Sequence, residues 1–299
     1  MKYTQSFRRQ QCKPMLRPSE ARVIGYHQRF DHLQNASTLL TDDNLLSSFF
    51  HADPANHLPY EQYYNMRPYE EIYQKSVLNG VSSDQSVVHA PYNMNISNYQ
   101  YHINQWARAR FLYETHCTRI CGQKYLNIHC GSVHKTDWKD MSECYKQIAD
   151  NINYVLNMVP DVTILLETMC NSKSVHIVGS SFEELAQIHA LVKQKERVGI
   201  TIDSAHCWEG AFVPEQNYAE NLLSSFQKHF KMEQLKCLHL NNSLTPYGSN
   251  NDRHEAIKDG KGTIPNEELK KLVQMTKCTI VMEIAVVEGQ IELVREWAQ

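Results

Sequence analysis

Short apolar runs rich in β-branched residues recur along the chain, and longer stretches with helical patterning separate them. Runs that are apolar almost throughout are typical of strands buried on both faces of a parallel sheet. The clear runs cover residues 23–25, 86–89, 125–129, 163–167, 198–203, 235–239 and 279–283, and a less regular run covers residues 45–50. The pattern therefore predicts eight strands that alternate with helices.

The last six runs share one feature, because each ends in a residue type that can bind a metal ion. These residues are His89, His129, Glu167, Asp203, His239 and Glu283. They recur about every 36 to 44 residues, which is the length of one strand, loop and helix in a (β/α)8 barrel of roughly 250 residues. We therefore predict an α/β fold, namely a TIM barrel with a single domain.

In a TIM barrel the carboxyl ends of the strands meet at one face, so these six side chains are expected to share a pocket. A lone histidine or acid at a strand end more often makes an ordinary polar contact. Several carboxylates in one pocket would repel one another unless a cation lay between them. The pattern therefore predicts a metal centre at the C-terminal face of the barrel.

Two loops add further candidate ligands. His206 follows Asp203 by three residues, where the chain can turn its side chain toward a second cation. Asp252 and His254 flank Arg253, and such a pair in an extended loop can bind one ion from the same side. The spacing therefore predicts more than one metal ion.

Length and composition fit one large domain, since the chain has 299 residues of which 42% are hydrophobic. Residues 1–21 carry five basic side chains, a single acid and two prolines. We interpret them as a flexible basic arm that precedes a barrel domain over residues 22–299. Contact with DNA, organelle targeting and a solvated tail without a role all remain open for this arm.

Compartment and partners follow from a few negative signals. No apolar run approaches the roughly 18 residues that span a bilayer, so we expect no membrane partner. Nine sparsely placed cysteines favour a reducing intracellular compartment, either cytoplasm or nucleus, and we interpret Cys117 and Cys121 as buried thiols. The net charge of -3 argues at first against nucleic acid, but bound divalent metals would focus positive potential in one cleft.

Seven segments resemble, in order, the signature motifs of the endonuclease IV family of zinc-dependent apurinic/apyrimidinic endonucleases. The segments are His89-Ala90-Pro91-Tyr92, His129-Cys130-Gly131, Leu166-Glu167-Thr168, Ile202-Asp203-Ser204-Ala205-His206, His239-Leu240-Asn241-Asn242-Ser243, Asp252-Arg253-His254-Glu255 and Met282-Glu283. All nine positions that bind the trinuclear zinc cluster of that family hold the expected residue type.

The resemblance implies three Zn²⁺ ions per chain. One ion would take His89, His129 and Glu167, a second would take Glu167, Asp203, His239 and Glu283, and a third would take His206, Asp252 and His254. Imidazole and carboxylate ligands suit catalytic zinc with open positions. Glu167 would bridge the first two ions.

The activity implied is hydrolysis of double-stranded DNA on the 5′ side of an abasic site, which leaves a 3′ hydroxyl and a 5′ deoxyribose phosphate. Two cations about 3.5 to 4 Å apart lower the pKa of a bridging water, and the third can stabilise the departing 3′ oxygen. Glu167 and Glu283 are both candidate catalytic residues for taking the proton of the water. We expect the protein to act as a monomer.

Two residues are candidates for DNA contact. Tyr92 matches a tyrosine that enters the duplex at the lesion in the family, and an inserted ring is a known way to kink DNA. It could instead pack on a loop at the barrel mouth. Arg253 could bind a phosphate or form a salt bridge that orients the metal cluster.

Other functions on the same scaffold remain open. Sugar isomerases and epimerases that resemble xylose isomerase share the barrel and its acidic and histidine ligands, and fold alone does not separate them from a nuclease. A non-catalytic DNA-binding or metal-storage protein is a further alternative. The loop over residues 168–172 also lacks the small, glycine-rich character usual in the family. Together with other departures from the family pattern, this allows an altered substrate preference.

Overall fold

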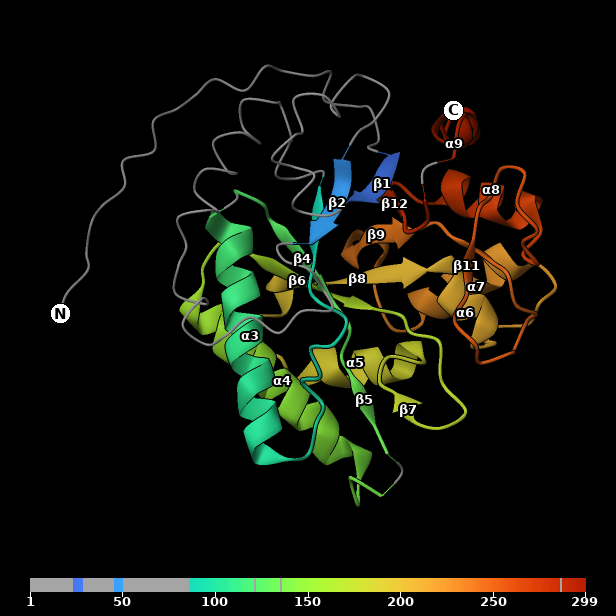
Figure 1. The fold of residues 1–299 in the computed structure, drawn as a ribbon. Helices are drawn as coiled ribbons and strands as arrows, with labels where there is room; N and C mark the ends of the chain where they lie inside the picture. The colour runs from blue at the N-terminus through green and yellow to red at the C-terminus, as the bar shows by residue number, and fades with distance from the viewer. Residues whose placement is uncertain (1–23, 29–45, 51–85, 121, 135, 286) are drawn as a thin grey trace, which may run out of the picture.

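The protein is described here from a computed structural model, which covers residues 24–28, 46–50 and 86–299 except 121, 135 and 286. Eight parallel strands close into a barrel in the order β1-β12-β9-β8-β6-β4-β3-β2, and β1 pairs with β2 to complete the ring (Figure 1). The predicted α/β TIM barrel is therefore confirmed. The predicted basic arm, residues 1–21, lies outside the described residues.

The barrel strands agree closely with the apolar runs. They are β1 (Ile24–Gln28), β2 (Leu46–Phe50), β3 (Val87–His89), β4 (Tyr125–Ile128), β6 (Thr163–Glu167), β8 (Val198–Asp203), β9 (Leu235–His239) and β12 (Thr279–Met282). His129 and Glu283, which were predicted to end strands, lie one residue beyond β4 and β12. The prediction of eight strands is thus confirmed, including the less regular run that forms β2.

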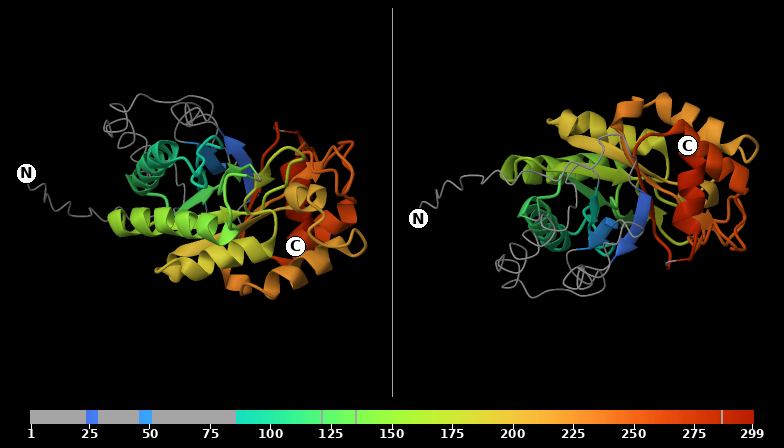
Figure 2. Two further views of the ribbon diagram at one scale, coloured as in Figure 1. Left: turned by 90° about the horizontal axis from the view of Figure 1, so that it is seen from below. Right: turned by 90° about the horizontal axis from the view of Figure 1, so that it is seen from above.

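Helices lie outside the strands, and their bounds are α3 (Tyr101–Ile120), α4 (Met141–Met158), α5 (Phe182–Leu191), α6 (Ser204–Glu209), α7 (Tyr218–Gln227), α8 (Asn266–Met275) and α9 (Gln290–Trp297). Figure 2 shows the strands at the centre, with the long helices α3 and α4 side by side at one flank. Short 3₁₀ turns, Lys195–Arg197 and Met232–Gln234, lead into β8 and β9.

Local signals explain where several helices begin. The Asp140 side chain accepts a hydrogen bond from the backbone N–H of Ser142 and caps α4, while the Ser181 hydroxyl accepts one from Glu184 and caps α5. At α6 the cap is Asp203, whose carboxylate accepts the backbone N–H of His206 at 2.8 Å. The last residue of β8 therefore both starts a helix and stands at the C-terminal face of the barrel.

Two small antiparallel ribbons extend the loops at that face. The strands β5 (Ser132–Val133) and β7 (His176–Ile177) pair with each other, and so do β10 (Asn242–Ser243) and β11 (His254–Glu255). The second ribbon matters for the site, because Ser243 stands opposite His254 in its register.

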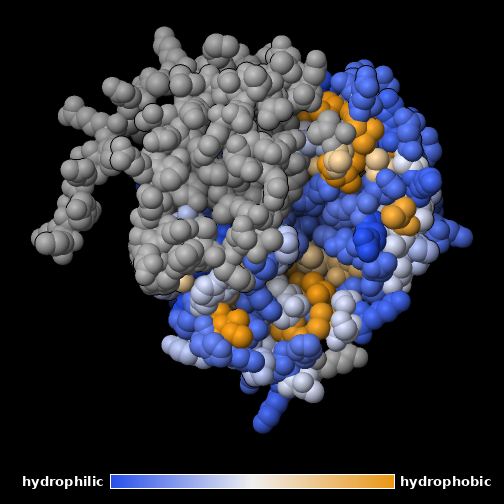
Figure 3. All heavy atoms as spheres, in the orientation of Figure 1, coloured by the Kyte–Doolittle hydropathy of each residue, from blue (hydrophilic) through white to orange (hydrophobic). Residues whose placement is uncertain are grey.

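The exposed surface is mixed in character. In Figure 3 hydrophilic side chains dominate the visible face outside the grey atoms, and hydrophobic residues form separate patches. Among the described residues, the helices are either too short or too polar to cross a membrane. The Cys117 thiol is buried, as predicted, whereas Cys121 lies outside the described residues.

Candidate metal centre

The barrel interior contains a small apolar layer below the site. It consists of Val87, Tyr125, Leu165, Cys237 and Val281, one residue from each of five strands. Side chains of a strand alternate between its two faces, so residues two positions further along point to the same interior. Those residues are His89, Asn127, Glu167, His239 and Glu283. Four of the candidate ligands, together with Asn127, therefore form the next interior layer, directly above an apolar floor.

Glu167 lies at the centre of this layer and is fully buried. Its Oε2 atom lies 3.2 Å from Nε2 of His89 and 3.1 Å from Nε2 of His129. Its Oε1 atom lies 3.0 Å from Nδ1 of His239. The two oxygens of one carboxylate thus face two different groups of ligands.

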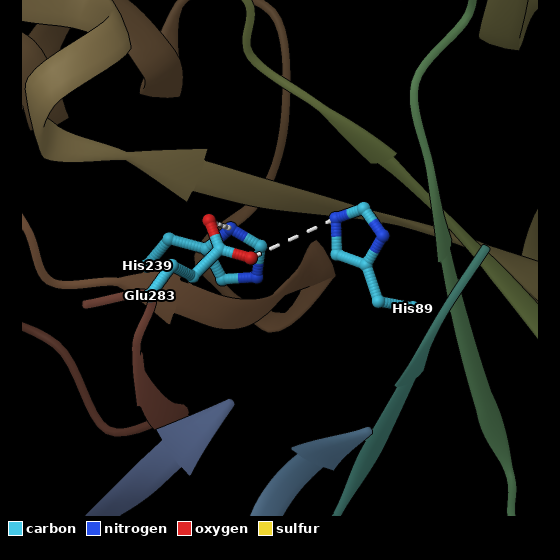
Figure 4. A group of neighbouring side chains, drawn as sticks. All are labelled: His89, His239 and Glu283. Carbon is cyan, nitrogen blue, oxygen red and sulfur yellow. Dashed lines mark ion pairs between the residues drawn. The ribbon is translucent and has the colours of Figure 1, made fainter. Parts of the chain in front are cut away.

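A second group surrounds Oε1 of Glu167. Nδ1 of His239 lies 3.0 Å from Oε2 of Glu283 and 3.8 Å from Oδ2 of Asp203. Figure 4 shows the Glu283 carboxylate beside the ring of His239 and facing His89 across the barrel, where its Oε1 lies 3.8 Å from Nε2 of His89. The acid that ends β8 and the acid that follows β12 therefore converge on one histidine of β9.

His206, Asp252 and His254 form a third group. The sequence placed His206 in a loop, but it lies on α6, whereas Asp252 and His254 come from the segment that leads into β11. Oδ2 of Asp252 lies 3.3 Å from Nε2 of His206, and its Oδ1 lies 3.3 Å from Nε2 of His254. The rings of His206 and His254 lie 5.2 Å apart, and Asp203 is 3.7 Å from His254. All nine residues predicted from the sequence are therefore brought together in one pocket.

The spacing of these atoms fits zinc. Ligand atoms about 2.0 to 2.1 Å from a tetrahedral zinc ion lie about 3.3 Å from one another, close to the separations around Glu167 and Asp252. Four sets of side chains have ligand atoms that all lie within 4.8 Å of one another: His89, His239 and Glu283; His89, His129 and Glu167; Glu167, Asp203, His239 and Glu283; and Asp203, His206 and His254. In addition, the buried Nε2 of His254 has no hydrogen-bond partner among the described residues. A cation would satisfy it.

Opposite charges hold the pocket together electrostatically. Burial raises the pKa of Glu167, but His239 and His129 outweigh it and hold that pKa well below its ordinary value. Burial lowers the pKa of His239, but Glu283 and Glu167 raise it well above the ordinary value. Burial also lowers the pKa of His206, but the nearby acids, with Asp203 contributing most, raise it well above its ordinary value. Protons on the histidines and cations in the pocket are therefore alternative ways to neutralise the acids.

Backbone carbonyls orient two of the histidine rings. Nδ1 of His206 lies 2.8 Å from the carbonyl oxygen of Thr168, and Nδ1 of His89 lies 2.6 Å from that of Ala90. A ring nitrogen that donates to a carbonyl carries the proton, which leaves Nε2 free to bind a metal. Both Nε2 atoms face the acids of the pocket.

Two buried asparagines that the sequence reasoning did not assign support the acids. Asn127 donates a hydrogen bond from Nδ2 to Oε2 of Glu167. Asn241 donates from Nδ2 to Oδ2 of Asp203 at 2.7 Å, and its Oδ1 accepts the backbone N–H of Glu283 at 2.8 Å. Each asparagine lies two residues from a histidine ligand, a spacing that places both side chains on one face of an extended chain. That spacing was the available signal.

The two DNA-contact candidates are both exposed, and each is close in the chain to candidate ligands. Tyr92 follows His89 by three residues, in the turn after β3, and 57% of its surface is exposed. Arg253 is exposed and makes no ion pair with the residues that the structure describes. In the loop after Glu167, Met169 and Cys170 are buried, so this loop packs against the barrel.

Comparison with known proteins decides the family. The family described as Xylose isomerase-like TIM barrel matches residues 49–297. A protein of Thermosipho melanesiensis named "Probable endonuclease 4" is 34% identical over 202 residues, which are 67% of this chain and 69% of that protein. The chain belongs to the endonuclease IV family.

Other members of the endonuclease IV family align over shorter stretches. The "Probable endonuclease 4" of Thermotoga neapolitana is 38% identical over 173 residues, which are 58% of each chain. The "Endonuclease 4 homolog" of Dictyostelium discoideum is 32% identical over 186 residues, which are 62% of this chain and 33% of that protein.

Solved structures agree on the fold. The chain matches endonuclease IV from Thermus thermophilus with a TM-score of 0.68 at 19% identity, over 93% of this chain and 98% of that one. It matches a D-tagatose 3-epimerase-like protein with a TM-score of 0.66 at 16% identity, over 92% and 96%. Endonuclease IV and sugar-epimerase barrels thus share this architecture, and the ligand set has to separate them.

Proposed function

We propose that the chain is a zinc-dependent apurinic/apyrimidinic endonuclease that hydrolyses the phosphodiester bond 5′ to an abasic site in double-stranded DNA. The observation that carries the proposal is Glu167, whose two oxygens face two separate ligand groups at 3.0 to 3.2 Å. The third group, around Asp252, completes the nine ligands that the family pattern predicts for three zinc ions.

Zinc bound by these ligands would lower the pKa of a water molecule and offset the charge of the scissile phosphate. The chain's own acids differ in what they can do beside it. Glu167 is fully buried and both of its oxygens face histidines, whereas the side chain of Glu283 is 13% exposed at the edge of the pocket. We therefore assign Glu283 to accept the proton of the attacking water and Glu167 to hold the ligand groups together.

The substrate would approach from the side where Tyr92 and Arg253 are exposed. The Tyr92 ring can stack in the gap that an abasic nucleotide leaves in the duplex. The Arg253 guanidinium can bind a phosphate beside the third ligand group, because it lies between two of its members in the chain. A flexible basic arm and a monomeric state remain predictions.

A sugar epimerase is the second candidate, because an epimerase-like protein has the same barrel and fold alone does not separate the two activities. Such a site needs one or two metal ions. The group of His206, Asp252 and His254 would then bind no metal ion. This counts against an epimerase, because two separate segments of the chain come together to form the group.

One experiment separates the two. The purified full chain is offered a duplex with a single abasic site, and in parallel a ketohexose, after treatment with a chelator and again after Zn²⁺ is restored. We expect cleavage on the 5′ side of the abasic site only when zinc is present, and no change of the sugar. Sugar conversion without DNA cleavage would reverse the assignment.

A further inference from the structure

Glu209, the last residue of α6, is a fully buried carboxylate outside the three ligand groups. Its Oε1 atom accepts hydrogen bonds from the hydroxyls of Ser243 at 2.6 Å and Thr245 at 3.1 Å. It also accepts the backbone N–H of Arg253 at 3.1 Å. Its Oε2 atom is buried and has no hydrogen-bond partner among the described residues. Burying a carboxylate with one oxygen unpaired costs free energy. The hydrogen bonds that Oε1 makes are therefore expected to have a function.

The three donors all belong to one segment, residues 243–253, which leaves β10 and returns as β11. The end of α6 binds this segment through its backbone as well. The N–H of Gly248 donates to the carbonyl of Trp208 at 3.1 Å, and the N–H of Asn250 donates to the carbonyl of Glu209 at 3.0 Å. Side-chain and backbone atoms of the loop therefore both form hydrogen bonds with the end of α6.

This arrangement links two parts of one ligand group. His206 and Glu209 are three residues apart on α6, so their side chains project toward the same side of the helix. His206 faces Asp252, while Glu209 holds the N–H of Arg253, the residue between Asp252 and His254. Glu209 thus binds the backbone between Asp252 and His254, and it lies on the same helix as His206, the remaining ligand of this group.

We propose that Glu209 is a positioning residue for the third metal site. It sets the distance of Asp252 and His254 from His206, and the inference rests on the proposed zinc cluster. A charged acceptor makes stronger hydrogen bonds than a neutral one, and three donors converge on one of its oxygens. Without that acceptor, the donors lose their common partner and the loop can move away from His206.

Glu184 offers a matched control. It is a mostly buried glutamate too, although it lies near the start of its helix, and its Oε2 accepts the backbone N–H groups of Gly179 and Ser180, both at 3.0 Å. Its Oε1 accepts from the Tyr145 hydroxyl at 2.9 Å. The loop that it holds carries no candidate ligand. Removing either glutamate breaks a comparable set of hydrogen bonds, but only Glu209 adjoins a ligand group.

The test is a titration of the metal-free full chain with Zn²⁺ against a competing chelator. Glu209→Ala should weaken the third zinc-binding step by about 10- to 100-fold, the usual effect of losing a partner of a metal ligand, and leave the other two steps unchanged. Glu209→Gln, which keeps an acceptor oxygen, should restore most of that affinity. Glu184→Ala should keep all three steps. Excess zinc should also recover DNA cleavage by Glu209→Ala, which a general loss of folding would not allow.

Wild-type zinc binding in all three steps by Glu209→Ala would overturn the proposal, as would an equal loss of all three steps in Glu209→Ala and Glu184→Ala. If Glu209→Ala fails to fold, Thr245→Val removes one donor from the loop side, and it should weaken the third step alone. An unchanged third step in Thr245→Val would then overturn the proposal. A wild-type chain that binds three zinc ions but does not cut abasic DNA would refute the proposed function, while the comparison of zinc affinities would still decide the role of Glu209.

Discussion

Nδ1 of His239 lies 3.0 Å from Oε1 of Glu167, and both side chains are fully buried. The two residues end β9 and β6, which are separated in the sheet by β8, so they meet across the interior of the barrel. A buried carboxylate is stabilised by the histidine that faces it only if a positive charge, on the histidine or on a bound cation, compensates the negative charge. This pair therefore joins opposite parts of the site, and disturbing it should affect more than one metal ion.

The first prediction concerns that shared carboxylate. Elemental analysis of protein purified without chelator should find about three zinc ions per chain, as nine ligands with Glu167 shared imply. Glu167→Gln should lower DNA cleavage by more than about 100-fold, and more than His254→Ala does, because it disturbs two ligand groups. A content of one ion or fewer, or equal and small losses in both variants, would refute the trinuclear assignment.

The second prediction concerns metal removal. Glu167, Asp203, Asp252 and Glu283 all face the pocket, so the metal-free protein presents concentrated negative charge to a phosphate backbone. The metal-free protein should bind an abasic duplex at least about tenfold more weakly than the zinc form, and the difference should be smaller for undamaged duplex. Binding is measured by fluorescence anisotropy at one fixed salt concentration. Equal affinity of the two forms would place the DNA away from this pocket.

The third prediction concerns Tyr92, which is 57% exposed and lies three residues from the ligand His89 in the chain. Stacking of an aromatic ring on bases contributes about 1 to 3 kcal/mol. Tyr92→Ala should therefore reduce cleavage at low substrate by roughly tenfold or more, at about 1.4 kcal/mol per decade. Tyr92→Phe is the control and should keep most of the activity. Zinc content should stay unchanged in both. Normal cleavage by the alanine variant would remove Tyr92 from the DNA interface.

The fourth prediction compares two adjacent buried asparagines. Asn241 binds the ligands Asp203 and Glu283, whereas Asn242 holds the backbone of Ile264 through hydrogen bonds of 2.9 and 3.0 Å. Asn241→Ala should lower zinc affinity or activity by about 10- to 100-fold. Asn242→Ala should lower thermal stability and leave zinc affinity near that of the wild type. Similar zinc losses in both variants would mean that the effect comes from the fold and not from the ligands.

The fifth prediction uses an ion pair away from the metal ligands. Nε2 of His176 lies 2.6 Å from Oε1 of Glu184. The hydrogen bond to Glu184 raises the pKa of His176. Burial acts to raise the pKa of Glu184, but the hydrogen bond and the charge of His176 act more strongly in the other direction, so the net effect is a lowered pKa. The stability from His176 is therefore complete below its unfolded pKa of about 6.5 and is lost as pH rises through the higher folded value.

The contribution of Glu184 behaves in the opposite way, since it is present above its unfolded pKa of about 4.3 and is lost as pH falls through the lower folded value. His176→Gln should thus cost about 1.5 to 3 kcal/mol between about pH 5 and 6.5, and clearly less at pH 9. Urea unfolding at each pH measures the difference from wild type, and the exposed His134 provides the control variant His134→Gln. A cost that does not change with pH would mean that the pair is not charged.

Much of this architecture was readable from the sequence. The runs that form β6, β8 and β9 were predicted with the same bounds, because near-continuous apolar residues with polar ends suit only strands that are buried on both faces. The candidate ligands were predictable for a related reason. Acids and histidines at the ends of such strands are costly unless a cation or partner compensates them, so their regular recurrence marks a site.

What the tertiary structure decided is how the side chains are layered and which distant segments meet. Only the closed barrel shows that Asn127, as well as His129, contacts Oε2 of Glu167, because the strand register pairs Asn127 with Leu165 and the contact depends on how the side chains meet in the interior. The contact of Glu209 with Arg253 joins residues 44 positions apart in the chain. No local spacing encodes it, since a carboxylate at a helix end is normally solvated and acquires a role only when another segment folds over it.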